Sequence, residues 1–325
     1  MAFYLYLPFI GLAVLANLGE ENKGLRSITY ALLVLLDLAL LGGGLLAMIV
    51  PLLMAGRSLP PANYGGLAVT LGLTAILGAL PLIPAVRRGL ARWLEIEPTS
   101  CVHATGLAFA VYFVGLTLAQ VALIGDLSKL TSVETRLSVP DIVATTLPLA
   151  LMALVGVGFF VRRDLRDTLE RLGLSWMTAR QWGLAILVIL LFLAFDYTVL
   201  WVWQHLWPAS HTLVGDIATN LFSDLAKPLA ALAVGLSAGI GEELLFRGTL
   251  QPRFGLVLTS LLFAIGHAHY GLSPAMIEVF VVGLVLGLLR RRTNTTTCLV
   301  VHAGYDFLDL LLLPYFPYLL SALSV

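Results

Sequence analysis

Long runs of leucine, alanine, valine and isoleucine, separated by short polar segments, dominate the hydropathy pattern of the chain. A transmembrane helix needs about 20 mostly apolar residues. Ten segments meet this requirement or come close to it: residues 2–18, 28–55, 65–86, 104–125, 140–161, 182–203, 228–250, 254–273, 274–290 and 296–318. Transmembrane β-strands would instead alternate over about ten residues, which these continuous runs do not. The pattern therefore predicts an all-α, polytopic integral membrane helical bundle of about ten transmembrane helices.

Composition agrees with this prediction. The chain is 59% hydrophobic and only 12% charged, whereas soluble domains carry about 25% charged residues. Its formal net charge is zero, so we expect no nucleic-acid partner. The two cysteines, Cys101 and Cys298, lie far apart and match no metal-binding or redox motif. Residues 1–18 lack the basic segment of a signal peptide and are expected to form a retained membrane helix.

Basic residues predict the orientation of the bundle. Of the 19 Lys and Arg residues, 14 lie in or beside the odd-numbered loops between the predicted spans, and 4 lie in the even-numbered loops. Because Lys and Arg are enriched on the cytoplasmic side, the odd-numbered loops are expected to be cytoplasmic. The three arginines at 290–292 orient the last spans independently of the early ones. We expect an integral protein of the cell (cytoplasmic) membrane.

Two of the predicted loops carry distinctive patterns. In residues 162–181, leucines that include Leu165, Leu169 and Leu172 form an apolar stripe among arginines, which predicts an amphipathic helix at the cytoplasmic membrane surface. Residues 204–227 hold His205 and His211, whose spacing fits no common metal site. We expect this second segment to be a solvated outer loop.

The seventh predicted span contains the sequence GIGEELLFRG, residues 239–248. Glu243 and Arg247 stand four residues apart, so on a helix they can form an ion pair. Glu242 is rotated by about 100° from Glu243 and can face a cavity, as a positioned general base would. The pattern also fits a purely structural ion pair at a helix end, and the residues alone leave both readings open.

Two further spans contribute histidines. His267 lies in FAIGHAH, residues 263–269, and taken alone it fits a packing histidine as well as a catalytic one. His302 and Asp306 are four residues apart, so both project from one helix face, where a carboxylate can orient an imidazole. His267, His302 and a carboxylate such as Glu242 would also satisfy a three-ligand zinc site. Ionisable groups within membrane spans are functional candidates by default.

Together these motifs resemble the CAAX prenyl protease and bacteriocin-processing (CPBP) family of intramembrane proteases. The family hallmark is EExxxR, then FxxxH, then HxxxN or HxxxD. This chain has Glu242-Glu243 through Arg247, then Phe263 through His267, then His302-x-x-x-Asp306. The stretch LERLGL, residues 169–174, also looks like a segment that often precedes the family core. The resemblance covers about residues 165–318.

The resemblance implies an intramembrane endopeptidase that cleaves membrane-associated or prenylated (CAAX-type) proteins or peptides. It implies that Glu242 acts as the base with His267 as its partner, while His302 and the residue four positions later stabilise the oxyanion. Glu243 and Arg247 would hold the geometry. Asp306 stands where the best-studied members have Asn, and an ionised Asp cannot donate a hydrogen bond. Asp306 would therefore be protonated or would orient His302.

The resemblance also implies a division of the chain and a set of partners. Residues 161–325 would form the amphipathic helix and the catalytic transmembrane core, and residues 1–160 would be N-terminal helices for scaffolding or docking. The expected partners are a lipidated peptide or membrane protein substrate and the bilayer, with an active site that opens toward the cytoplasmic side. We expect no cofactor, with zinc as the alternative.

Three other readings compete with this one. Residues 235–239 read GLSAG, a formal match to the serine nucleophile motif, but Ser237 lies in an apolar helix where small residues favour close helix packing. The GxxxG pattern at 283–287 predicts another packing face. A non-catalytic scaffold or accessory subunit of a larger membrane complex is the second reading. A transporter is the third, and the absence of an evident repeat in the sequence argues against it.

Overall fold

The computed structural model describes residues 2–54, 62–125, 136–268, 271 and 273–315. The first half contains α1 (Ala2–Leu18), α2 (Lys23–Leu53), α3 (Tyr64–Ala79), η1 (Leu80–Leu82), α4 (Pro84–Leu90), α5 (Cys101–Ile124) and α6 (Val139–Gly156). The second half contains α7 (Leu165–Leu172), α8 (Ala179–Leu206), α9 (Pro208–Phe222), η3 (Ser223–Leu225), α10 (Pro228–Glu243), η4 (Leu244–Leu250), α11 (Gln251–Gly266), α12 (Pro274–Arg292), α13 (Thr295–Leu312) and η6 (Leu313–Tyr315).

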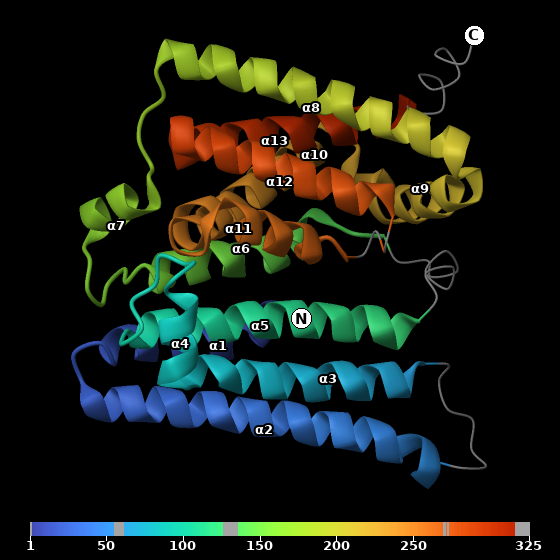
Figure 1. Cartoon of the computed structure of the whole chain (residues 1–325). Coiled ribbons are helices and arrows are strands. Elements are labelled where there is room, and N and C mark those ends of the chain that lie inside the picture. The colour runs from blue at the N-terminus through green and yellow to red at the C-terminus, as the bar shows by residue number, and fades with distance from the viewer. Residues whose placement is uncertain (1, 55–61, 126–135, 269–270, 272, 316–325) are drawn as a thin grey trace.

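The predicted all-α membrane bundle is confirmed, and each of the ten predicted segments corresponds to a helix in the described residues. Seven helical segments are long and apolar enough to cross a membrane. One of these, Pro228–Gly266, joins two of the predicted spans. The helix α1 is apolar but shorter than a full span. Figure 1 shows the long helices lying roughly side by side, with the short α4 and α7 at one end and α9 at the other.

Two layers make up the bundle. α1, α2, α3 and α5 pack together, and α10 packs against both α6 and α13. α1 also packs against α6, which joins the layers. The Nδ2 atom of Asn17 donates to the carbonyl of Val155 at 2.9 Å, and the Nε atom of Arg162 donates to Oδ1 of Asn17 at 3.0 Å. Polar contacts therefore tie α1 to α6 and to the segment that leads into α7.

The predicted amphipathic helix forms as α7. Asp164 caps its N-terminus and Gly173 ends it in the left-handed conformation. Thr168 and Leu172 face the protein, whereas Leu165 is 57% exposed. This arrangement suits a helix that lies on a membrane surface and packs on the bundle edge.

The expectation of a loop at 204–227 is wrong, because residues 208–222 form the helix α9. Pro208 is in its first turn, where proline is favoured since it has no N–H to bond. Trp203 is buried, and its indole Nε1 donates to Ser210 at 3.3 Å, which folds α9 back on α8.

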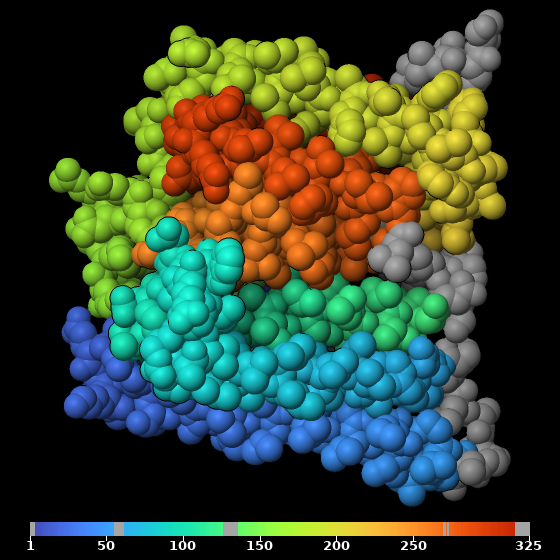
Figure 2. Space-filling view, in the orientation of Figure 1, coloured from blue at the N-terminus to red at the C-terminus, as the bar shows by residue number. Residues whose placement is uncertain are grey.

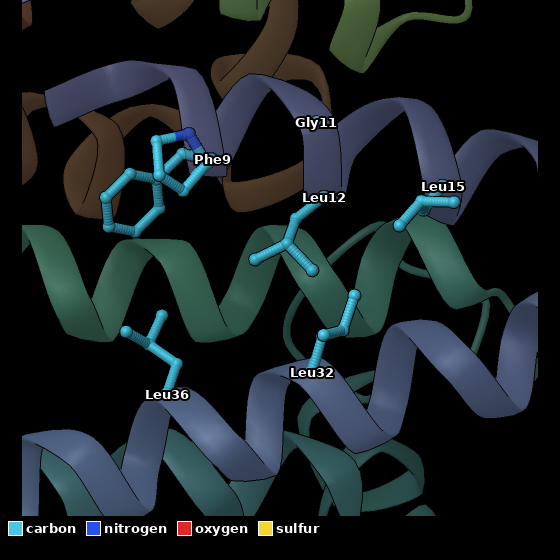
Figure 3. A pocket seen from close by; sticks show the side chains of 7 residues that line it. Phe9, Gly11, Leu12, Leu15, Leu32 and Leu36 are labelled. Carbon is cyan, nitrogen blue, oxygen red and sulfur yellow. The ribbon is translucent and has the colours of Figure 1, made fainter. Parts of the chain in front are cut away.

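An apolar groove also lies between α1 and α2, and Figure 3 shows leucines and Phe9 lining it.

Candidate active site

Glycines bring the motif-bearing helices close together. A Cβ atom on Gly235 would lie 2.5 Å from the carbonyl oxygen of Ala303 in α13, and one on Gly241 would lie 2.4 Å from the carbonyl oxygen of Thr146 in α6. Only glycine permits these approaches, as in small-residue helix packing within membranes. The predicted packing role of these glycines is confirmed. The hydroxyl of Ser237, the alternative nucleophile, hydrogen bonds to the Thr146 hydroxyl.

The first motif spans a change of helix type. α10 ends at Glu243, and η4, which follows, is a π-helix. Such segments occur mostly as short insertions and often at functional sites. Within it, the hydroxyl of Thr249 donates to the carbonyl of Leu244 at 3.1 Å. The π-helix therefore begins directly after the two glutamates and contains Arg247.

A buried network joins three of the candidate residues. The predicted ion pair forms: Nη1 of Arg247 lies 3.0 Å from Oε1 of Glu243, and their side chains are 1% and 0% exposed. Nδ1 of His302 lies 2.7 Å from the same carboxylate oxygen. The guanidinium also lies over the ring of Phe263, 4.3 Å from its centroid. Because both charges are removed from solvent, this pairing is essential to their burial.

A more accessible set lies beside this network. Nε2 of His267 is 4.0 Å from Oε2 of Glu242, and their side chains are 23% and 15% exposed. Nδ1 of His267 is 2.9 Å from the carbonyl oxygen of Phe263. A carbonyl only accepts hydrogen bonds, so Nδ1 carries the hydrogen and Nε2 faces the glutamate. Glu242 and His267 thus present a carboxylate and an imidazole to a common space.

Asp306 connects the accessible and buried sets. Its Oδ2 atom lies 3.4 Å from Nε2 of His302, and its side chain is 23% exposed. His302 therefore has a carboxylate at each ring nitrogen, Glu243 on one side and Asp306 on the other. All six candidate residues are brought to one region of the bundle by α10, η4, α11 and α13.

The zinc alternative fits this arrangement poorly. Both ring nitrogens of His302 face carboxylates rather than a common point with His267 and Glu242. In the part of the chain that the structure describes, no group of three or more His, Cys, Asp or Glu side chains has the geometry to hold a metal ion.

The bundle also contains a cluster of three acidic residues that was not predicted from the sequence. Asp196 of α8, Glu278 of α12 and Asp309 of α13 interact with one another inside the bundle. Asp196 and Glu278 are each 7% exposed, and Oδ2 of the first and Oε1 of the second have no hydrogen-bond partner among the described residues. Their acidic identity within apolar spans was a visible signal, but none belongs to a recognised motif.

The second predicted packing face also forms. Gly283 approaches Phe263 and Ser260, and a Cβ atom on Gly287 would lie 2.3 Å from Cδ1 of Leu256, so the GxxxG pattern fits α12 against α11. This packing supports the helix from which Phe263 and His267 project.

Comparison with known proteins adds to this picture. A family model described as type II CAAX prenyl endopeptidase Rce1-like matches residues 224–308, a range that contains all six candidate residues. An uncharacterized protein of Bacillus subtilis (strain 168), YpbD, is 32% identical over 148 residues, which cover 45% of this chain and 74% of that protein. An uncharacterized 24.3 kDa protein of Escherichia coli is 34% identical over 89 residues, or 23% of this chain and 41% of that protein. No solved structure matches.

The fold and the site define a polytopic helical membrane protein with clustered glutamate, histidine and aspartate side chains within its bundle. The chain belongs to the Rce1-like family of type II CAAX prenyl endopeptidases, which are CPBP intramembrane endopeptidases.

Proposed function

We propose that this protein hydrolyses peptide bonds of membrane-associated or lipidated substrates without a metal ion, with Glu242 as general base. The observation that carries the proposal is the pairing of accessible Glu242 and His267 beside the buried network of Glu243, Arg247 and His302. A base must be reachable by water, while the residues that position it are best held rigidly. The side chains of Glu242 and His267 are the more exposed set, and Oε2 of Glu242 is buried without a hydrogen-bond partner among the described residues, so a bound water would satisfy it.

In the proposed reaction, a water molecule binds between Oε2 of Glu242 and Nε2 of His267, whose 4.0 Å separation is too long for a direct hydrogen bond. Glu242 takes a proton as the water oxygen attacks the peptide carbonyl carbon. The C–N bond then breaks, and the protonated Glu242 returns that proton to the leaving amine. The attack and the C–N cleavage thus need only Glu242, one water molecule and the substrate.

The oxyanion needs a donor, and we assign this role to His302, with Asp306 as the residue that positions its ring. The Glu243 carboxylate is paired with Arg247, so Nδ1 of His302 donates to it. A ring that also donates from Nε2 must be doubly protonated. Its Nε2 hydrogen faces Asp306 at a long 3.4 Å and turns to the oxyanion when the substrate carbonyl arrives. Asp306 then serves to hold the charged ring in place.

The location of the site supports a proposed substrate class and a proposed side of entry. The site lies among membrane helices, so its substrate must reach the bilayer through a lipid anchor or a membrane segment. The arginine-rich loops favour the cytoplasmic side as the side of entry. The proposed partners are thus the bilayer and an anchored peptide.

Cleavage assays can test this proposal. The full chain, reconstituted in liposomes, should cleave members of a library of prenylated and membrane-anchored peptides, with products identified by mass spectrometry. Glu242→Gln and His267→Ala should abolish cleavage, whereas Ser237→Ala, a half-buried control on the same helix that tests the serine reading, should retain it. If no peptide is cleaved, or if the first two variants cleave as well as the wild type, the protein is better described as a non-catalytic membrane subunit.

A further inference from the structure

Four arginines from different segments converge at the end of the bundle that carries α7. Arg163 precedes α7, Arg171 lies within it, and Arg253 and Arg290 belong to α11 and α12. Arg171 interacts electrostatically with each of the other three. All four side chains are partly buried rather than extended into solvent. They therefore form one basic cluster that draws on three helices.

The contacts of this cluster leave its charge uncompensated. Nη1 of Arg171 donates to the carbonyl of Gly248 at 3.1 Å, Nη1 of Arg253 donates to the carbonyl of Glu95 at 3.2 Å, and Arg163 donates to the carbonyl of Val157. These acceptors are neutral. Among the described residues, no carboxylate forms an ion pair with any of the four, although Asp167 lies near enough to interact with Arg163.

Arg290 is the member that most directly indicates a ligand. Its guanidinium lies against Gly173, the left-handed residue that ends α7. Its Nε atom is buried and has no hydrogen-bond partner within the described part of the chain. A buried charged donor without an acceptor is costly. An anion that reached this atom would satisfy it.

The crowding of like charges lowers the pKa of one member of the cluster, Arg171. Burial, and then the charges of Arg253, Arg163 and Arg290, lower the pKa of Arg171 to about 10. A shift of that direction means that the protonated form is disfavoured where it stands. A bound anion would reverse this penalty.

The surroundings place the cluster at the level of lipid headgroups. Trp93, Phe160 and Trp176 are 88%, 89% and 99% exposed. Phe160 and Trp176 lie near Arg163 and Arg171 in the sequence, and Trp93 stands two residues before Glu95, whose carbonyl accepts from Arg253. Exposed aromatic side chains of this kind are enriched at the membrane–water interface. Figure 2 shows the segment of α4 and the residues that follow it protruding at the same end as α7.

We propose that Arg163, Arg171, Arg253 and Arg290 form a binding site for the phosphate of an anionic phospholipid headgroup. Basic pockets between helices on the cytoplasmic side of membrane proteins suit such headgroups. The ligand would bind a residue that touches the helix of the candidate active site, because Arg171 donates to the carbonyl of Gly248, the residue after Arg247. The bound lipid would thereby fix α7 on the π-helix.

The test uses the full chain in phosphatidylcholine nanodiscs with increasing phosphatidylglycerol, followed by native mass spectrometry of the lipid that remains bound. Wild-type protein should retain phosphatidylglycerol in preference to phosphatidylcholine. Each arginine near the surface contributes about fivefold in affinity. Arg171→Gln with Arg290→Gln should therefore lose most of the retained lipid, and Arg290→Gln alone, which breaks no contact of α7 with η4, should lose part of it.

The matched control is Arg88→Gln with Arg291→Gln, which removes two exposed charges from the same end. Equal loss in this control would show a diffuse basic surface and overturn the site. Unchanged retention in Arg290→Gln and in the double variant would also overturn it. If inorganic phosphate displaces phosphatidylglycerol at equal concentration, the site takes a free anion and the assignment to lipid is wrong.

Discussion

Nδ1 of His302 lies 2.7 Å from Oε1 of Glu243, although the two residues are 59 positions apart in the chain. The contact locks α13 to the end of α10, at the point where the π-helix begins. Arg247 pairs with the same oxygen. One buried carboxylate oxygen of Glu243 thus sets the positions of an arginine and an imidazole.

Removal of Arg247 should unfold the site. Arg247→Ala breaks the buried pair and leaves the Glu243 carboxylate with His302 alone, and loss of one partner of a buried ion pair costs about 3–5 kcal/mol. Thermal unfolding in detergent can be followed with a thiol-reactive dye, because Cys101 and Cys298 are both free and fully buried. The exposed Arg291→Ala should melt like the wild type. Equal melting temperatures for both variants would show that the buried ion pair does not stabilise the fold.

Substitution of Gly235 should separate α10 from α13. A methyl group 2.5 Å from the Ala303 carbonyl forces the helices apart, and such overpacking costs about 1–3 kcal/mol. Gly235→Ala should lower the melting temperature in the same dye assay and reduce any peptide cleavage. Gly183→Ala is the control, since nothing lies within 4 Å of a Cβ at that position of α8. A Gly235→Ala protein as stable as Gly183→Ala would contradict the close packing.

Asp306 allows the proposed oxyanion site to be tested with a conservative change. Asp306→Asn keeps an acceptor for His302 and adds an amide donor, so cleavage should persist. Asp306→Ala removes the carboxylate that holds the His302 ring, so kcat should fall, at most by about the 10²–10³-fold that loss of the oxyanion donor itself would cost. Cleavage rates of the two variants under saturating substrate provide the measurement. Equal activity in both would remove Asp306 from the site.

Chelators should leave the proposed activity intact. His302 has carboxylates at both ring nitrogens, so it is poorly placed to join His267 and Glu242 around zinc. Treatment with 1,10-phenanthroline, followed by removal of the chelator and a metal assay, should leave the cleavage rate unchanged. Inhibition that is reversed by added zinc would replace the glutamate mechanism with a metal-dependent one.

Removal of one charge from the acidic cluster of Asp196, Glu278 and Asp309 should raise the melting temperature. Glu278 and Asp196 are buried together with Asp309, and both burial and the neighbouring carboxyl groups disfavour an ionised carboxylate at this place. Glu278→Gln should therefore raise the melting temperature, while the exposed Glu21→Gln should not. A lower melting temperature for Glu278→Gln would show that its carboxyl makes a contact that the amide cannot replace.

Hydropathy was sufficient to predict the helices, because a lipid-exposed span has to be long and apolar whatever it packs against. It was not sufficient for α9. Its fifteen residues are too short and too polar to read as a span, and its place is set by Trp203 and Ser210. Local spacing likewise predicted the pairs of Glu243 with Arg247 and of His302 with Asp306, which lie four residues apart.

The contact between Glu243 and His302 was beyond such reasoning, because spacing along one helix says nothing of another. It depends on how closely α10 approaches α13, and so on glycines that were predicted to pack but not against a particular partner. The π-helix could not be predicted either, since its residues are those of an ordinary apolar helix. Tertiary packing decided both.

The carboxyl groups of Asp196 and Glu278 also bear on how the chain is made. A single aspartate at the centre of a helix adds about 2.5–3.5 kcal/mol to the cost of insertion. The Asp196 partner on α12 is synthesised roughly 80 residues later, and at 5–20 residues per second this is a delay of about 4–16 s. During that time α8 must be held in the bilayer by its leucines and valines, or at the flank of the translocon. The Asp196 carboxyl on α8 therefore gains its acidic neighbours only when α12 and α13 arrive, well after α8 itself has been made.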